Sequence, residues 1–181
     1  MNDTTFTLDI TSTQDAFGDG RHPSTKGAIA ALEALAHLQG FENVLDMGCG
    51  SGILALQAAY QWHVPVLAAD ISKEAVATTR ANAEKNSLQD LITAIHSDGF
   101  DHTTIAQRAP YDVMIMNILA ETLHAMAKTA CEHLAEEGII LLSGILKWHG
   151  TAVEEAYQAQ GLTLLQRITV EDWVTLILQK Q

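Results

Sequence analysis

Apolar and polar positions along the chain repeat with two different periods, and the alternation between these periods predicts the secondary structure. Continuous or alternating apolar runs indicate strands, whereas apolar residues spaced three and four apart indicate amphipathic helices. The first pattern predicts strands at 6–10 (a short edge strand), 43–48, 65–70, 92–97, 111–117, 138–143, 162–170 and 173–179. The second predicts helices at 24–37 with Ser24 or Thr25 as the N-cap, 52–61, 72–86 with Ser72 as the N-cap, 118–133 and 148–158.

The order of these elements predicts an α/β fold. A helix between two successive strands returns the chain to its starting edge, so the strands pair in parallel. Only Glu171 and Asp172 separate the last two strands, which makes them an antiparallel hairpin. We therefore predict a Rossmann-like, mostly parallel, seven-stranded sheet with an antiparallel C-terminal hairpin strand and helices on both faces. Because no linker or repeat interrupts the 181 residues, residues 1–181 are expected to form a single domain.

A glycine-rich turn follows the first strand of the predicted parallel part. Gly48, Gly50 and Gly52 bring bare backbone close to any ligand above the turn, and Asp70 at the next strand end is placed to accept from ribose hydroxyls. A dinucleotide site needs a third glycine where this chain has Ile53. The glycine spacing therefore favours a nucleoside ligand without phosphate. S-adenosylmethionine is the commonest ligand of this kind. NAD, and an ordinary strand-to-helix turn without a ligand, remain the alternatives.

Polar residues also mark the ends of other predicted strands, where the ligands of parallel sheets bind. Asp46 lies at the end of the first of these strands. Asp98, with Gly99 beside it, is placed to meet an adenine edge, and Asn117 lies where a transferred methyl group would point. Asp98 could instead cap a helix or lie in a loop, and Asn117 could be a turn residue.

The net charge of the chain indicates which classes of binding partner are favoured. Ten basic residues against 22 acidic ones give a formal charge of −12. This charge disfavours nucleic acid, because contacts from basic side chains to phosphate supply most of the affinity of nucleic-acid-binding proteins. It fits a solvated acidic surface, or attraction for a cationic partner such as a sulfonium cofactor or a lysine-rich protein.

Other compositional features concern the compartment and metals. The longest strongly apolar run, at 138–146, is too short to cross a bilayer, and residues 1–20 lack the pattern of a secretion signal. A disulfide at Cys49 would obstruct the glycine turn, so a reducing compartment, the cytoplasm, is expected. The eight histidines show no metal-ligand spacing, so we expect no metal site.

Four segments together resemble the catalytic domain of the ribosomal protein L eleven methyltransferase (PrmA-type) family of class I methyltransferases. They are residues 17–25 (FGDGRHPST), the glycine turn with 53–55 (ILA), 117–120 (NILA) and 142–146 (LSGIL). The likeness runs from about Ala16 to the C-terminus, and the first and third segments are the specific ones. Members of this family use S-adenosylmethionine to methylate amino groups, mainly of lysine, on a ribosomal stalk protein. The resemblance implies cofactor contacts at Thr25, Gly48, Asp70 and Asn117.

Three departures from the family pattern limit what the resemblance carries over. The family usually has a separate N-terminal domain that holds the ribosomal protein, and we expect no such substrate-recognition domain in this sequence. Asp19 stands where the family has threonine, which puts a negative charge beside the cofactor mouth, and Ser24 replaces another threonine. The cofactor assignment therefore transfers to this chain, whereas the protein substrate does not.

The chemistry of methyl transfer assigns roles to a few residues. The reaction mainly requires alignment of acceptor, methyl group and sulfur, and a lysine acceptor must lose a proton first. The Asn117 side-chain carbonyl can accept from the attacking amine. Ile118, Leu119 and Ala120 follow it in place of the prolines and ring that accompany planar nitrogen acceptors, which favours an aliphatic amine.

Two aromatic residues each have two alternative roles in this scheme. His22 is a candidate for proton removal or for closing a lid over the cofactor, although a histidine beside a proline is more often a structural hydrogen-bonding residue. Trp173 at the hairpin is a candidate for the entrance of the acceptor, or an ordinary half-buried ring.

Together these observations predict an S-adenosylmethionine-dependent N-methyltransferase acting on lysine or terminal amino groups of a protein. The alternatives are a small-molecule or RNA methyltransferase, or a cofactor-binding module that needs a partner for substrate recognition. The candidate catalytic residues are Asn117 and His22, and the candidate cofactor-binding residues are Thr25, Asp46, Gly48, Gly50, Gly52, Asp70, Ile71, Asp98, Gly99 and Asn117.

Overall fold

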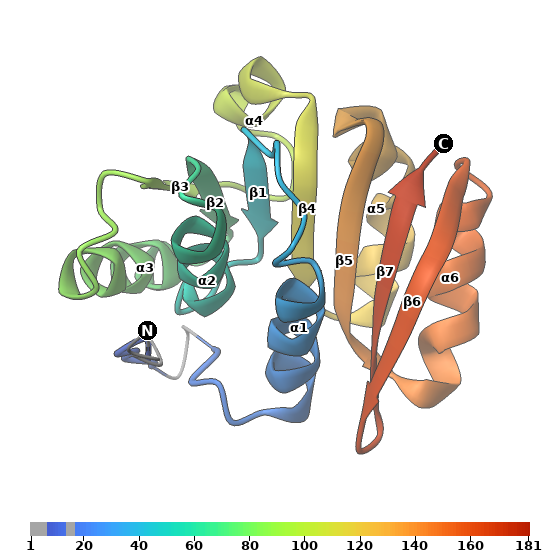
Figure 1. The fold of residues 1–181 in the computed structure, drawn as a ribbon, viewed down its shortest axis with the longest axis horizontal. Coiled ribbons are helices and arrows are strands. Elements are labelled where there is room, and N and C mark those ends of the chain that lie inside the picture. The colour runs from blue at the N-terminus through green and yellow to red at the C-terminus, as the bar shows by residue number, and fades with distance from the viewer. Residues whose placement is uncertain (1–6, 14–16) are drawn as a thin grey trace.

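The computed structural model describes residues 7–13 and 17–181, in which seven strands form one sheet (Figure 1). The strands are β1 (Val44–Met47), β2 (Val66–Asp70), β3 (Ile92–His96), β4 (Tyr111–Asn117), β5 (Leu134–Leu146), β6 (Leu162–Val170) and β7 (Trp173–Lys180). The helices are α1 (Pro23–Ala34), α2 (Ile53–Trp62), α3 (Lys73–Lys85), α4 (Thr103–Arg108), α5 (Ala120–His133) and α6 (Gly150–Gln158), with the 3-10 turn η1 at Lys147–His149. None of these helices has the length and apolar content needed to cross a membrane.

The strand order is β3-β2-β1-β4-β5-β7-β6, with β1 to β5 parallel and β7 antiparallel to both of its neighbours. The predicted fold class and C-terminal hairpin are therefore confirmed. The order reverses at β1, which lies between β2 and β4, and ligands of such sheets bind beyond the carboxyl ends at this point. Met47 pairs with both Ala69 and Met116, so the residues that follow β1, β2 and β4 emerge side by side.

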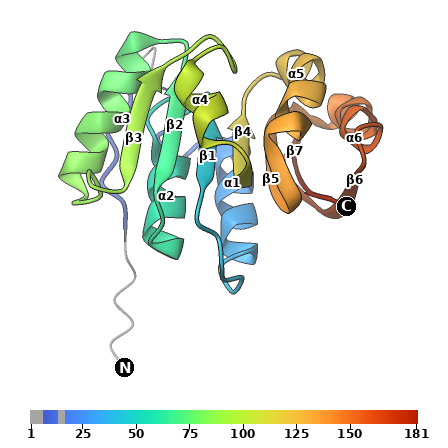
Figure 2. The same cartoon turned by 90° about the horizontal axis from the view of Figure 1, so that it is seen from above.

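Side chains of successive strand residues enter two separate apolar layers. Helices α1 to α3 cover one face of the sheet and α4 to α6 cover the other (Figures 1 and 2). On β1, Val44 packs in the first layer, whereas Leu45 and Met47 pack in the second. Because both faces are covered, the central strands are apolar on both sides, which explains their continuous apolar runs in the sequence.

Helix α1 differs from the prediction at both ends. It begins at Pro23 and ends at Ala34, and its N-cap is His22 instead of Ser24 or Thr25. Proline is favoured in the first turn because its missing N–H would have no helical partner there. The cap bond runs from the Ser24 N–H to Nδ1 of His22 (3.2 Å). A histidine in this role gives little sequence signal, since serine and threonine are the usual caps.

Other boundaries differ from the sequence prediction for local reasons. The predicted helix at 118–133 begins two residues later, because Ile118 and Leu119 continue away from β4 before α5 starts, and Leu119 is extended. The strand predicted at 138–143 is longer, because β5 begins directly after α5. The six-residue α4 is too short to show a helical period and was not predicted. The helix at 148–158 divides into η1 and α6.

The expected edge strand at 6–10 is not formed by residues 7–10, and Phe6 lies outside the described residues. Asn82 on α3 and Asn86, the C-cap of α3, hold this segment instead. Asn86 accepts from the Asp9 N–H (2.9 Å) and donates to the Asp9 carbonyl (3.0 Å), and Asn82 binds both backbone groups of Thr11 in the same way (3.0 and 2.8 Å). Side-chain amides thus supply the partners that a neighbouring strand would have supplied.

Helix α1 lies unusually close to β7. A Cβ atom on Gly27 would meet Oγ1 of Thr175 at 2.6 Å. Thr175 is buried and its Oγ1 is hydrogen-bonded to Oγ of Ser143 (2.8 Å), so it has little freedom to move aside. Gly27 therefore sets the distance between α1 and the C-terminal half of the sheet.

Replacing Gly27 by alanine tests this packing. Alanine favours a helix by about 0.5–1 kcal/mol over glycine, yet we expect Gly27→Ala to lower the free energy of unfolding by about 1–3 kcal/mol through overpacking. Urea denaturation measures the change. The neighbouring exposed substitution Lys26→Ala is the control, and equal stability of the two variants would contradict the close approach.

Candidate active site

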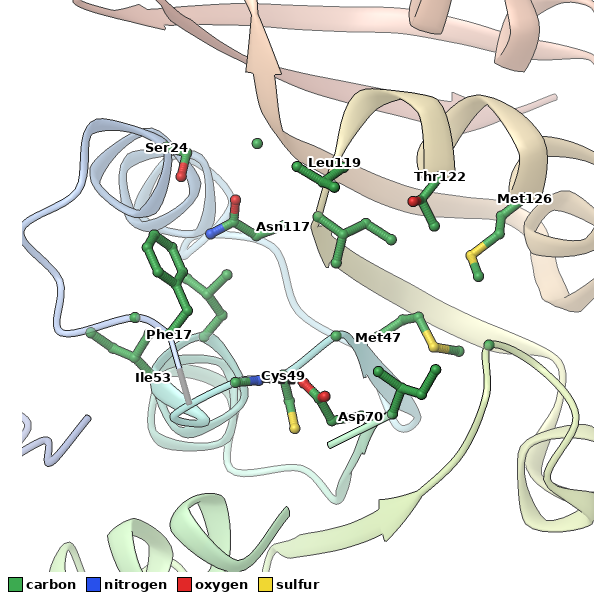
Figure 3. Close-up of a pocket in the computed structure, with 18 of the residues that line it drawn as sticks. Phe17, Ser24, Met47, Cys49, Ile53, Asp70, Asn117, Leu119, Thr122 and Met126 are labelled. Carbon is green, nitrogen blue, oxygen red and sulfur yellow. Dashed lines mark hydrogen bonds between the residues drawn. The ribbon is translucent and has the colours of Figure 1, made fainter. Parts of the chain in front are cut away.

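A cavity of about 610 Å³ opens beyond the carboxyl ends of β1, β2 and β4, where the strand order reverses (Figure 3). Its volume lies within the range of small-molecule sites. Of the candidate residues, the structure brings together in its lining His22, Gly48, Gly50, Asp70, Ile71, Asp98, Gly99 and Asn117. Thr25, Asp46 and Gly52 do not line the cavity.

The glycine turn after β1 requires its glycines. Gly48, Gly50 and Gly52 have φ angles of +76°, +56° and +82°, a region that residues with a side chain rarely adopt. A Cβ atom on Gly50 would overlap the carbonyl oxygen of Phe17. This carbonyl accepts from the Ser51 N–H (2.8 Å), so the segment before α1 crosses directly over the turn.

Helix α3 supports the turn from below, through residues that the sequence analysis missed. Oγ1 of Thr79 donates to the Gly50 carbonyl (3.1 Å), and Nδ2 of Asn82 donates to the Ser51 carbonyl (2.7 Å). A Cβ atom on Gly52 would meet Oγ1 of Thr79 at 2.9 Å, so Gly52 serves the packing of the turn. The available signal was that Thr79 and Asn82 are polar residues on the sheet-facing side of α3. Polar side chains at buried positions need hydrogen-bond partners.

Asp70 joins the end of β2 to this turn. Its Oδ2 accepts from the Gly50 N–H (2.9 Å) and its Oδ1 accepts from the Ser72 N–H (2.8 Å). A carboxylate oxygen can accept more than one hydrogen bond, so both oxygens retain capacity for donors from a ligand. Asp70 therefore presents fixed acceptors to the cavity, as a pair of ribose hydroxyls would require.

Asp46 lies behind the cavity wall. Its Oδ2 accepts from the Ala55 N–H in the first turn of α2 (3.0 Å), and its Oδ1 is buried without a partner. Burial raises the pKa of Asp46 from 3.8 to about 7; the Ala55 N–H opposes this rise and the charge of Asp70 adds to it. The geometry makes Asp46 a connection between β1 and α2, set back from any ligand.

Asn117 occupies the opposite side of the cavity from Asp70. Figure 3 shows it between Ser24 on α1 and Leu119 at the start of α5. Its Nδ2 donates to Oγ1 of Thr25 (3.5 Å), and its Oδ1 is buried without a hydrogen-bond partner. Thr25 is fully buried behind Asn117. A buried acceptor without a donor is costly, and Asn117 lines the cavity, so Oδ1 is a candidate acceptor for a ligand group that donates a hydrogen bond.

His22 connects three parts of the cavity mouth. Its ring packs edge-on against Phe17 (5.1 Å between centroids) and against Trp173 at the β6–β7 hairpin (4.7 Å). Because Nδ1 accepts from the Ser24 N–H, a neutral ring carries its proton on Nε2. Oγ of Ser24 lies 2.8 Å from Nδ1. The structure thus shows His22 as the cap of α1 and as a packing residue at the mouth, and its role in proton removal stays a prediction.

The described residues contain no group of three or more His, Cys, Asp or Glu side chains arranged to hold a metal ion. Cys49 lines the cavity as a free, buried thiol. Burial and the nearby Asp46 raise its pKa well above the usual value, so it remains neutral.

The pKa of Asp46 leads to a pH-dependent stability. The folded protein holds this proton more tightly than the unfolded chain, so the contribution of Asp46 to the free energy of unfolding falls as pH rises from 3.8 to about 7 and is constant above that. Asp46→Asn keeps an acceptor for Ala55 and removes the titration. We expect the stability of this variant relative to wild type to rise across that window by up to about 4 kcal/mol.

Urea denaturation at a series of pH values measures this difference. Asp90→Asn, at an exposed position, is the control for loss of one negative charge. Parallel stability curves for the two variants would refute the role given to Asp46.

Comparisons with known proteins identify the family. Residues 13–181 match the family model described as ribosomal protein L11 methyltransferase (PrmA). The curated relative of that name from Rhodopseudomonas palustris is 38% identical over 165 residues, which are 91% of this chain and 56% of the relative, and the one from Mesorhizobium japonicum is 40% identical over 164 residues, 91% of this chain and 57% of the relative. The chain thus spans a little over half the length of these relatives.

Solved structures give the same result. The chain superposes on a ribosomal protein L11 methylase from Lactobacillus delbrueckii with a TM-score of 0.75 at 28% identity, over 92% of this chain and 82% of that one. A precorrin-6y C5,15-methyltransferase from Geobacter metallireducens, at 15% identity and a TM-score of 0.71 over 95% of this chain and 94% of that one, shares the fold. The chain belongs to the ribosomal protein L11 methyltransferase (PrmA) family.

Proposed function

We propose that this chain is an S-adenosylmethionine-dependent N-methyltransferase domain that methylates lysine or terminal amino groups of a ribosomal protein of the L11 type. The observation that carries the proposal is the unpartnered, buried Oδ1 of Asn117 across the cavity from Asp70. Oδ1 of Asn117 suits an incoming amine, and the Asp70 carboxylate suits the ribose of an adenosyl group. Membership of the family supports the same reaction.

The residues of the cavity fit this cofactor. Asp70 has lone pairs free for ribose hydroxyls, and the bare backbone at Gly48 and Gly50 allows close approach of a ligand. Ile53 lines the cavity where a pyrophosphate would otherwise meet the helix, so the wall is apolar there. Asp98 and Gly99 border the remaining side, where an adenine edge would lie.

The main contribution of the protein is to orient the substrate amine relative to the methyl group of the cofactor. The bound cofactor supplies an electrophilic methyl group on a positively charged sulfur. Oδ1 of Asn117 accepts from an N–H of the substrate amine, which aims the nitrogen lone pair away from Asn117 and into the cavity. A lysine amine has an ordinary pKa of about 10.4, and partial burial beside a sulfonium favours its neutral, reactive form. In this proposal His22 caps α1 and packs at the cavity mouth.

Two other functions remain the alternatives. A small-molecule or RNA methyltransferase could use the same cofactor half, although the charge of −12 disfavours RNA. A binding module that depends on a partner for substrate recognition would fit the partial coverage of the relatives. We propose that residues 1–181 act as one domain around the single sheet, in the cytoplasm, where the free thiols of Cys49 and Cys131 stay reduced.

Methylation of recombinant ribosomal protein L11 tests the function. With cofactor tritiated on the methyl group, we expect label on the protein, resistant to RNase and located on amino groups by mass spectrometry. Asn117→Ala should lower kcat about 10-fold to 150-fold through loss of one hydrogen bond to the reacting amine. Label confined to small molecules or to RNA in a cell lysate would refute the proposal.

Substitution of Thr25 tests whether this residue contacts the cofactor or positions Asn117. The buried Thr25 holds the Asn117 amide, so Thr25→Val should lower kcat about threefold to tenfold and leave the Kd of S-adenosylmethionine, measured by calorimetry, within twofold. Thr25→Ser, which keeps the hydroxyl, should restore kcat. A raised Kd with unchanged kcat would instead make Thr25 a cofactor contact, as the family resemblance implies.

A further inference from the structure

A second hollow, of about 220 Å³, lies beside the first turn of α5 and is separate from the cavity described above. It is lined by Ala120, Glu121 and His124 from α5 and by His149, Ala152 and Val153 from η1 and α6. We call it the α5–α6 hollow. None of its residues lines the active-site cavity, so the mechanism proposed above does not use it.

The start of α5 forms a ridge between the two depressions. Leu119, Thr122 and Met126 face the active-site cavity, as Figure 3 shows, whereas Ala120 and Glu121 face the α5–α6 hollow. A helix with side chains is about 10–12 Å across. An extended polypeptide rises about 3.3 Å per residue, so three or four residues cross this ridge.

Exposed apolar side chains lie on the ridge and beside the hollow. Leu119 has 68% of its surface exposed and Trp148 has 69%, the two highest values among the large apolar residues of the described chain. The Trp148 ring lies 6.2 Å, between centroids, from that of His149, which lines the hollow. Tryptophan is enriched among the residues that contribute most to binding at protein interfaces.

Charge indicates the kind of partner. Glu121 forms no ion pair with any residue that the structure describes, and the chain as a whole carries a net charge of −12. A second copy of this acidic chain would therefore be repelled, whereas a lysine-bearing, basic segment would be attracted. The hollow and the cavity that Asn117 lines lie on either side of the first turn of α5.

We propose that the α5–α6 hollow binds an apolar side chain of the protein substrate, three or four residues away in sequence from the amine that is methylated. The substrate segment is extended and basic, and it crosses Leu119 with its acceptor side chain directed toward Asn117. The inference rests on the proposed function, because it names the substrate features that the same site recognises.

Filling the hollow tests the proposal. Ala152→Arg places a long side chain in it from an exposed helical position, and Thr151→Arg, one residue earlier and outside the lining, adds the same charge to the same turn of α6. With recombinant ribosomal protein L11 as the probe, we expect Ala152→Arg to raise KM at least tenfold and leave kcat and the Kd of S-adenosylmethionine within twofold. Thr151→Arg should leave all three within twofold.

A second measurement examines the substrate side. Alanine substitution of apolar residues three or four positions from the methylated residue of the probe should raise its KM for wild-type enzyme, with no further increase for Ala152→Arg. Trp148→Ala should raise KM, whereas Leu165→Ala, at a half-exposed position on β6, should not.

The outcomes distinguish the two proposals. Equal KM values for Ala152→Arg and Thr151→Arg, or a changed oligomeric state for Ala152→Arg in light scattering, would overturn the docking surface while leaving the proposed function intact. If the wild-type enzyme methylates no protein amine, the proposed function fails and the docking surface fails with it.

Discussion

The hydrogen bond from the Gly50 N–H to the Asp70 carboxylate is the interaction on which the site depends. It joins the turn after β1 to the end of β2, and it holds the carboxylate beside backbone that carries no side chain. The turn is enclosed by Phe17 above and by Thr79 below, so only glycine fits between them. Shape and charge at this side of the cavity thus follow from one compact arrangement of backbone bonds.

The acceptor side is fixed by a different set of contacts, which meet on α1. Oγ of Ser143 on β5 donates to the Ser24 carbonyl (2.9 Å), and Oγ1 of Thr25 accepts from Asn117. The close approach at Gly27 holds the same helix against β7. One helix therefore carries both the anchor of the acceptor residue and the His22 cap of the segment that crosses the cofactor turn. Movement of α1 would alter the two halves of the site together.

The sequence analysis identified the elements whose burial produces a strong apolar pattern. It missed features of the structure that depend on a single side-chain contact. The central strands were found because both of their faces are covered, and the hairpin because two residues join it. The His22 cap was missed because histidine is an unusual capping residue, and α4 because it has too few residues to show a period. The contacts of Asn82 and Asn86 were missed because their partners are distant in sequence. Pattern reasoning has no access to such contacts.

Local sequence alone determined the succession of strands and helices, the glycine turn and the carboxylate at the end of β2, because each follows from the period or spacing of nearby residues. Only the tertiary structure decided which candidates face the cavity. It placed Thr25 behind Asn117 and Asp46 behind the turn, although both adjoin residues that line the site. The physical reason is that a side chain's direction depends on the packing of its element against others. Such packing joins residues as far apart as Thr25 and Asn117, beyond the reach of any local pattern.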